Sequence, residues 1–403
     1  MIPTVGWSTL LFSRNPSANV CLFTLRRESQ LKKRREAERA EGIEKGIIAD
    51  PEKPRKLADA VKLVGTCQEM CPEYERVERI VQKDVWGPEA DPVKLKNGGG
   101  VVAVEQRMVK KFKRAAAGLD EQLPSDLRPP GALKKTCDYL FDDLLGGAEN
   151  LAKVHHFIWD RTRAIRNDFS IQQVSKLAEV QIAVDCYERI ARFHILSLHK
   201  LALPDKPYDK YDWYQEREQL DKTLLSLMQY YDGTRGRMRF TNEPEFRAYS
   251  IILQIQTPIP DLEDRVQTWP QDIVLDARIQ RALKLYALAA NTSDPQGPIK
   301  PLTVHNIAQT NFMRFWALVR SKETSYLMAC AAEVYFKIVR REALKNLWVA
   351  DRRNQVQTDN WSVASMTKYL GFDNEEQTRN FVEAYSFAIG QRDDGTPFLN
   401  WGS

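Results

Sequence analysis

The sequence contains no uninterrupted apolar run near the roughly 18 residues that a membrane-spanning helix needs, which excludes an integral membrane protein. Cysteine is also scarce. The six cysteines of the 403 residues are irregularly spaced, at Cys21, Cys67, Cys71, Cys137, Cys186 and Cys330. This usage is typical of a reducing compartment, so we expect free thiols rather than a disulfide framework.

The sequence motifs of common enzymes are absent as well. None of GxxxxGK[ST], GxGxxG, HExxH or GxSxG occurs, and the run Gly98 to Gly100 lacks the Lys-Ser/Thr of a phosphate-binding loop. The five histidines show no spacing of a catalytic or metal site. Cys67 and Cys71 have no second Cys or His pair after them, which favours packed thiols over zinc ligands. We therefore expect no catalytic residues, no cofactor and no metal.

Excess positive charge is small. The 59 Lys and Arg against 54 Asp and Glu give a net charge of +5, too little for a general polyanion binder, so a nucleic-acid site must be a local patch. The candidate residues are Arg107, Lys110, Lys111, Lys113, Arg114, Arg235, Arg237, Arg239, Arg340, Arg341, Arg352, Arg353, Lys368 and Arg379. Each alone is most often solvated surface. The last six together predict weak, salt-sensitive and sequence-tolerant binding to RNA or single-stranded DNA.

The chain is longer than one hydrophobic core of about 250 to 300 residues supports, so two subdomains or an elongated array are expected. We expect a disordered or charged helical segment at 1–60, an extended segment (the strap) at 61–132, a helical array at 133–348 and a winged helix at 349–403. Within the strap, one helix is predicted over about Val104 to Ala117.

Two features of the N-terminal segment allow two interpretations each. Residues 1–27 contain no acidic residue, which suits a transit peptide or a loosely attached terminus. The run Lys32 to Arg35 suits a nuclear import signal or the solvated face of a helix.

Helical periodicity dominates residues 133–348. Apolar residues recur at steps of three and four between Leu177 and Leu198, and again between Leu327 and Ile338. We find no fixed-period repeat of the tetratricopeptide kind. The pattern predicts an irregular array of helical hairpins.

The last residues predict a winged helix. A helix over Ser362 to Leu370 is followed by a turn and a second helix whose cap is Asp373 with Glu376. A hairpin follows between Phe387 and Leu399, and a short strand is expected near Val356. Four aromatic residues either fill the core of this small module or anchor a partner subunit: Trp361, Phe372, Phe398 and Trp401.

Charges alternate along one predicted helix, at Asp160, Arg161, Arg163, Arg166 and Asp168. They suit a buried or half-buried ion-pair network between adjacent helices better than direct ligand binding.

A specific resemblance begins in the strap. The segment from Gly65 to Arg76, which contains Cys67, Cys71, Pro72, Glu75 and Arg76, resembles the signature of the GANP or Sac-three family of messenger-RNA export scaffolds. Further matches follow in the family's order: Leu127-Arg128-Pro129, Asp138-Tyr139-Leu140, the run Phe157 to Asp168, Arg192-Phe193-His194, Glu245-Phe246 with Tyr249, Asn311-Phe312 with Arg314-Phe315, and Arg341-Glu342-Ala343-Leu344.

The resemblance implies a mainly α fold, a PCI/TPR-like helical array ending in a winged helix with a small β-hairpin. It implies a nuclear, pore-associated transcription-export scaffold that pairs with a second PCI-domain subunit and a small acidic DSS-type peptide. A DEAD-box helicase and nuclear-pore proteins are further implied partners, with weak joint nucleic-acid binding. The family's FG-rich, centrin-binding and acetyltransferase regions are not expected within these residues.

Two alternatives to this scaffold remain. One is a stand-alone winged-helix protein that binds nucleic acid. The other is a related PCI scaffold in splicing, the proteasome lid or the signalosome, which shares the fold and differs in its partner.

Overall fold

The computed structural model describes residues 16–48, 50, 62–97, 101–113, 122–202, 211–255, 262–293, 312–352 and 359–401. They form two compact units whose boundary falls inside one helix, after Ile190. Unit 1 comprises the described residues up to Ile190 together with Tyr211, and unit 2 comprises the described residues 191–202 and 212–401.

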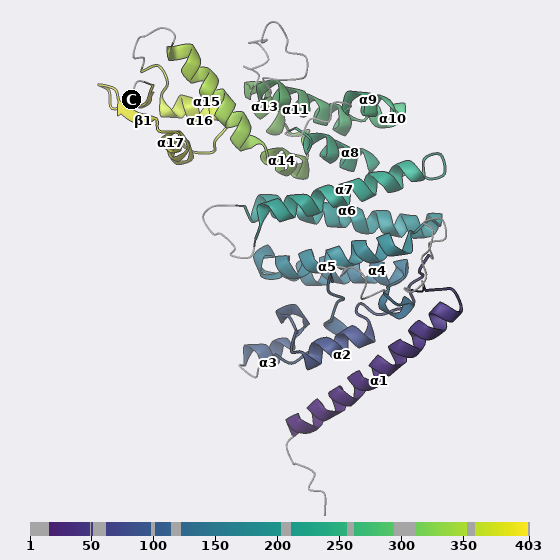
Figure 1. Ribbon diagram of the computed structural model, residues 1–403. Helices are drawn as coiled ribbons and strands as arrows, with labels where there is room; N and C mark the ends of the chain where they lie inside the picture. Colours follow the sequence, from purple (N-terminus) through teal and green to yellow (C-terminus); the bar gives the residue numbers. More distant parts are fainter. Residues whose placement is uncertain are drawn as a thin grey trace, which may run out of the picture. The chain divides into compact units, whose positions relative to one another are not determined.

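Unit 1 is helical (Figure 1). Its α-helices are α1 (Pro16–Glu44), α2 (Glu73–Val81), α3 (Pro92–Lys96), α4 (Pro130–Asp138), α5 (Leu151–Gln172) and the first part of α6 (Leu177–Lys200). Shorter turns are the 3-10 helices η2 (Gly87–Glu89), η3 (Glu105–Arg107) and η4 (Pro124–Asp126), and the π-helix η5 (Tyr139–Leu145). The apolar side chains of α4, α5 and α6 form the core of the unit.

The charged N-terminal helix, α1, packs against the strap. Arg27 donates to Glu73 (2.8 Å) and to Glu105 (2.9 Å), and Glu38 accepts from the hydroxyl of Ser125 (2.6 Å). The predicted charged helix is confirmed, although part of its charge contacts protein rather than solvent. Within the run Lys32 to Arg35, Arg35 pairs with Asp126 and the two residues before it are exposed.

The helix predicted over Val104 to Ala117 is wrong in its described part. Only Glu105–Arg107 form a short 3-10 turn, and residues 108–113 form neither a helix nor a strand. Residues 114–121 lie outside the described residues. The amides that a helix would bond internally instead donate to other elements, those of Val109, Lys111 and Phe112 to side chains and that of Lys110 to the carbonyl of Met70 (3.0 Å).

Unit 2 begins with the second part of α6 and continues as an irregular helical array (Figure 1). Its helices are α7 (Trp213–Gly233), α8 (Glu243–Ile252), α9 (Leu262–Gln267), α10 (Gln271–Val274), α11 (Ala277–Ser293), α13 (Phe312–Val319), α14 (Tyr326–Glu333), α15 (Phe336–Arg352), α16 (Val363–Leu370) and α17 (Glu375–Ala384). Helix α8 packs on α7, α11 and α14, and α11 also packs on α13 and α15.

Two periodic stripes can be compared with these helices. The stripe between Leu177 and Leu198 is confirmed as one helix, α6. The stripe between Leu327 and Ile338 is interrupted, because α14 ends at Glu333 and α15 starts at Phe336. Periodicity alone did not show this break, since the apolar spacing continues across it.

The C-terminal module, described residues 359–401, contains α16, a tight turn, α17 and a hairpin. Strands β1 (Ala388–Gln391) and β2 (Pro397–Asn400) pair antiparallel, so the predicted helix–turn–helix and hairpin are confirmed. The cap of α17 differs from the prediction: the side chain of Asn374, not Asp373, accepts from the N–H of Gln377 (2.9 Å). The strand expected near Val356 lies outside the described residues.

Glycine is required at the end of α16. Gly371 has a φ of 69°, and a Cβ there would lie 2.5 Å from the indole of Trp316. The module is thereby packed directly on α13. The expected fold class, mainly helical with a small C-terminal hairpin, is confirmed. In the part of the chain that the structure describes, no helix has both the length and the apolar character to span a membrane.

Candidate functional site

The signature segment of the strap lies along a later part of the same strap. The N–H of Thr66 donates to the carbonyl of Pro124 (2.9 Å), and that of Cys67 to Leu127 (3.0 Å). The N–H of Gly65 donates to the side-chain oxygen of Gln172 in α5 (3.0 Å). A Cβ at Gly65 would lie 2.6 Å from the carbonyl oxygen of Leu127, so this close approach requires glycine.

One buried carboxylate, Asp168 of α5, is fully enclosed and faces two cations. Its Oδ1 accepts from Nζ of Lys110 (2.6 Å) and its Oδ2 from Nε of Arg128 (2.8 Å). Arg128 also donates to the carbonyl of Met70 in the signature segment (3.1 Å). Asp168 therefore joins three parts of the strap to one helix.

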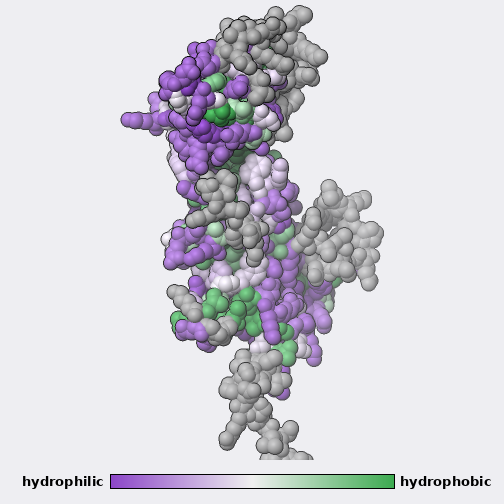
Figure 2. Space-filling model, turned by 90° about the vertical axis from the view of Figure 1, so that its left-hand side faces the viewer, coloured by the Kyte–Doolittle hydropathy of each residue, from purple (hydrophilic) through white to green (hydrophobic). Residues whose placement is uncertain are grey.

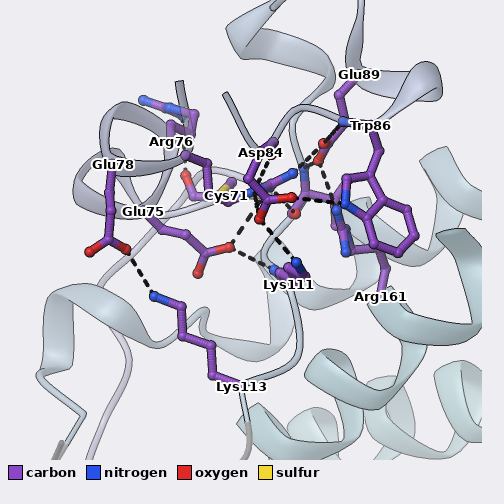
Figure 3. A network of polar contacts seen from close by, with 12 residues as sticks. Cys71, Glu75, Arg76, Glu78, Asp84, Trp86, Glu89, Lys111, Lys113 and Arg161 are labelled. Carbon is purple, nitrogen blue, oxygen red and sulfur yellow. Dashed lines mark hydrogen bonds and ion pairs between the residues drawn. The ribbon is translucent and has the colours of Figure 1, made fainter. Parts of the chain in front are cut away.

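A second enclosed carboxylate, Glu89, is drawn at the upper right of the network in Figure 3. It pairs with Arg79 of α2, and its Oε1 lies 3.2 Å from Nη2 of Arg161 in α5. The amides of Trp86 (3.1 Å) and Val109 (3.2 Å) also donate to Glu89. Two guanidiniums and two amides thus share one carboxylate.

The backbone amides after Met108 donate hydrogen bonds to carboxylates. The N–H of Lys111 donates to Glu75 (2.7 Å), and that of Phe112 to Asp160 (3.2 Å), which also pairs with Arg161. These bonds, with the one from Val109, satisfy amides that a helix would have bonded internally. They explain why this stretch is not helical.

The other charged residues of the predicted cluster stack or lie buried. The Arg163 guanidinium lies 4.0 Å from the ring centre of Phe112. Burial lowers the pKa of Arg166 to about 10. Arg76 donates to the carbonyl of Cys71 (3.2 Å), and Pro72 immediately precedes α2. Predicted residues of the signature segment and of the run Phe157 to Asp168 therefore meet around α5 and the strap.

The arrangement is suited to holding the strap against α5 rather than to acid–base chemistry. Burying a charge is costly unless it is paired, and the oxygens of Asp168 and Glu89 already accept hydrogen bonds from cations and amides. Among the residues that the structure describes, no group of three or more His, Cys, Asp or Glu is placed to hold a metal ion. We call the contacts that Asp168, Glu89, Glu75 and Asp160 make with the strap and α5 the strap network.

The described thiols differ in exposure, which gives a testable consequence. Cys71 is fully buried, and burial raises the pKa of its thiol well above the usual value; burial raises that of Cys330 to about 11. We expect iodoacetamide near pH 8 to modify the half-buried Cys67 before Cys71 and Cys330 in the folded chain. Peptide mass spectrometry measures the order. Equal rates in concentrated guanidinium chloride are the control, and equal rates in the folded chain would contradict the burial described.

The candidate phosphate-binding residues of the strap have different surroundings. Lys110 is buried against Asp168 and donates to the carbonyl of Asp126 (2.7 Å), so it is not available to a phosphate. Lys111 pairs with Asp84 (2.9 Å) and Lys113, more exposed, with Glu78 (3.0 Å). Arg114 lies outside the described residues.

The C-terminal candidates also separate into buried and exposed groups. Arg340 donates to the carbonyls of Leu370 (3.0 Å) and Gly371 (2.9 Å), and burial lowers its pKa to about 10. Arg341 and Lys368 are exposed. The remaining candidates are Arg379, 3.9 Å from Glu375, and Arg352 and Arg353, whose side chains lie outside the described set.

The four aromatic candidates are at least partly covered by their own module. Trp361 donates to Asp351 (2.9 Å) and packs on Tyr369. The remaining three pack as follows: Phe372 on Phe381 and beneath Arg340, Trp401 on Phe387, and the Phe398 ring over Gly390.

Three residues at the centre of the strap network were not among the predicted site residues: Arg79, Glu89 and Arg128. Glu89 lies 72 residues from Arg161 in the sequence, and no local spacing connects them. Arg128 belongs to Leu127-Arg128-Pro129, one of the segments that resemble the family, and this resemblance was the only feature of the sequence that pointed to it. Burial of charged residues that flank apolar positions is a tertiary property that sequence periodicity does not report.

Comparisons with known proteins show to which family this chain is similar. The sequence profile described as SAC3/GANP family matches residues 70–391. SAC3 family protein 1 of Schizosaccharomyces pombe is 39% identical over 377 residues, which cover 93% of this chain and 35% of that protein. Protein xmas of Drosophila melanogaster is 28% identical (83% of this chain, 15% of that protein), and SAC3 family protein B of Arabidopsis thaliana 29% (81% and 18%). The chain thus spans about a third or less of these relatives.

Proposed function

The chain belongs to the SAC3/GANP family, and from that premise we propose that it is a non-enzymatic scaffold subunit of a nuclear transcription-export complex at the nuclear pore. In this proposal it pairs with a second PCI-domain subunit and a small acidic DSS-type peptide. The observation that supports the proposal best is the extent of the family match, which includes both the strap network and most of the C-terminal module.

The C-terminal module is the proposed pairing site. It is a helix–turn–helix with a two-stranded hairpin, the arrangement of a winged helix, and such modules pair with one another as well as bind nucleic acid. Its second helix exposes Glu375, Glu376 and Glu383. An acidic face is poorly suited to a phosphate backbone, which favours a protein partner there over stand-alone nucleic-acid binding.

Nucleic-acid contact is proposed as a joint and weak property of the complex. Of the C-terminal candidates, Lys368 and Arg341 are exposed for it, although Arg341 also pairs with Glu342 (2.8 Å), whereas Lys110 and Arg340 are used internally. Two exposed cations release few counterions, so the affinity should be low and fall with added salt. A helicase and pore proteins are further proposed partners.

Co-expression tests the pairing. We expect this chain, a second PCI-domain subunit and a DSS-type acidic peptide to elute from a sizing column as one stoichiometric complex, because large scaffold interfaces are stable through purification. The matched control is the chain without residues 359–401, which should not pair. A full-length chain that elutes alone beside the partner would contradict the proposal.

A further inference from the structure

A short stretch of unit 1 exposes apolar side chains that nothing in the described structure covers. Val93 and Leu95 of α3 are 64% and 43% exposed, and Val101 and Val102, which follow α3, are 56% and 38% exposed. Figure 2 shows hydrophobic surface on the face of the molecule on which Figure 1 draws α3. We call Pro92–Lys96 and residues 101–104 the α3 patch. Single exposed apolar residues are common, but several together indicate an interaction surface.

The α3 patch also contains a strand edge. The N–H of Asp91 donates to Val102 (2.8 Å) and that of Val104 donates to Glu89 (2.9 Å), with an antiparallel bridge between Ala90 and Ala103. In this pattern the N–H and C=O of Ala103 point away from the paired segment. They make no hydrogen bond to any described residue. An unpaired edge of this kind is a template for another extended chain.

The surface around the α3 patch has an excess of positive charge, because its acidic residues already pair with other groups of this chain. Glu89 belongs to the strap network, Asp91 accepts from the amides of Val93 and Lys94, and Glu105 pairs with Arg27. By contrast, Lys94 and Arg107 make no ion pair within the described part of the chain. The local surface is therefore apolar with a positive rim.

We propose that the α3 patch binds an extended peptide in which apolar and acidic residues alternate, and that this peptide adds a strand at Ala103. The valines and Leu95 take its apolar side chains, and Lys94 and Arg107 attract its carboxylates. The proposal goes beyond the pairing function, because it assigns a second protein-binding site in unit 1, remote in sequence from the C-terminal module.

Two other occupants fit the observations less well. Residues 1–15 of this chain are apolar but contain no acidic residue, so they do not complement the positive rim. A membrane surface would accept the apolar and basic side chains, but hydrocarbon cannot satisfy the N–H and C=O of Ala103. A peptide strand satisfies all three features.

The experiment selects phage-displayed random 12-residue peptides on the full chain and then measures synthetic copies of the enriched peptides by fluorescence anisotropy. We expect sequences that alternate apolar residues with Asp or Glu. The double variant V93S/L95S should weaken their binding about tenfold or more, and K94E, which keeps the apolar surface, should also weaken it. The matched control is V64S, because Val64 is an equally exposed valine (63%) of unit 1 outside the α3 patch.

Hydrogen exchange at Ala103 separates the strand mode from other modes, since only an added strand protects that amide. Several results would overturn the proposal: no enriched peptide, enriched peptides without acidic residues, equal binding by V93S/L95S, or an Ala103 amide that stays unprotected. Cosedimentation with phosphatidylcholine–phosphatidylserine vesicles in place of peptide binding would assign the surface to a membrane instead. None of these results depends on whether the C-terminal module pairs.

Discussion

Replacing Glu89 by alanine is expected to lower the free energy of opening of unit 1 by about 3–5 kcal/mol. Glu89 is fully buried and is the common partner of Arg79 and Arg161, both of which are at most 2% exposed. Its removal takes away the carboxylate that the two guanidiniums share, so that Arg161 keeps Asp160 and Arg79 keeps only the more distant Glu75 (3.9 Å) and Asp84 (3.8 Å). Two backbone amides also lose their acceptor. The cost of a buried cation that has lost a main partner exceeds the net gain that the intact pair provided.

Hydrogen exchange in a urea series, resolved by peptides over residues 62–113, measures this loss in unit 1. E89Q separates charge from shape: it preserves the volume but places an amide against two cations, so it should also destabilise. The matched control is E149A, because Glu149 is 84% exposed and forms an ion pair with Lys153, which is itself 67% exposed, so it should change stability by less than about 1 kcal/mol. Equal effects of E89A and E149A would contradict the strap network.

The sequence allowed the charged helix α5 to be located, but not the partners of its charges. Asp160, Arg161 and Asp168 were expected to form ion pairs between adjacent helices, but Asp168 pairs with Lys110 and Arg128, which lie outside any helix. Their partners, Glu89, Lys110 and Arg128, lie 40 to 72 residues away in an irregular strap. Neither spacing nor periodicity specifies contacts of that range. The structure was needed to show that Lys110 is a buried ion-pair partner rather than a surface cation.

The failed helix at Val104 to Ala117 has a physical reason of the same kind. Its residues favour a helix locally, but Glu75, Glu89 and Asp160 accept the amides of Lys111, Val109 and Phe112. Tertiary hydrogen bonds therefore override local propensity. The C-terminal hairpin was predictable because its turn, Asp393 to Thr396, is specified by adjacent residues.

A second large loss of stability is expected when Phe372 is replaced. Phe372 either fills the core of the C-terminal module or anchors a partner subunit, and the two roles predict different results. It is only 9% exposed, it contacts Phe381, and the Arg340 guanidinium lies 3.9 Å from its ring centre. We expect F372A to lower the free energy of opening of the C-terminal module by about 3–5 kcal/mol, as for other buried Phe-to-Ala changes. Hydrogen exchange of peptides over residues 359–401 measures this.

The comparison with Tyr385 then decides what Phe372 does for pairing. Tyr385 is 36% exposed at the end of α17 and packs on Phe381, so Y385A should change module stability by less than about 1 kcal/mol. If Phe372 belongs to the core, F372A weakens pairing with the second PCI-domain subunit only because it opens the module. Low temperature or an osmolyte, which favours the folded module, should then restore pairing. If Phe372 is instead an anchor, F372A loses pairing while exchange in the module stays unchanged. The enclosure of its ring by Arg340 and Phe381 favours the first outcome.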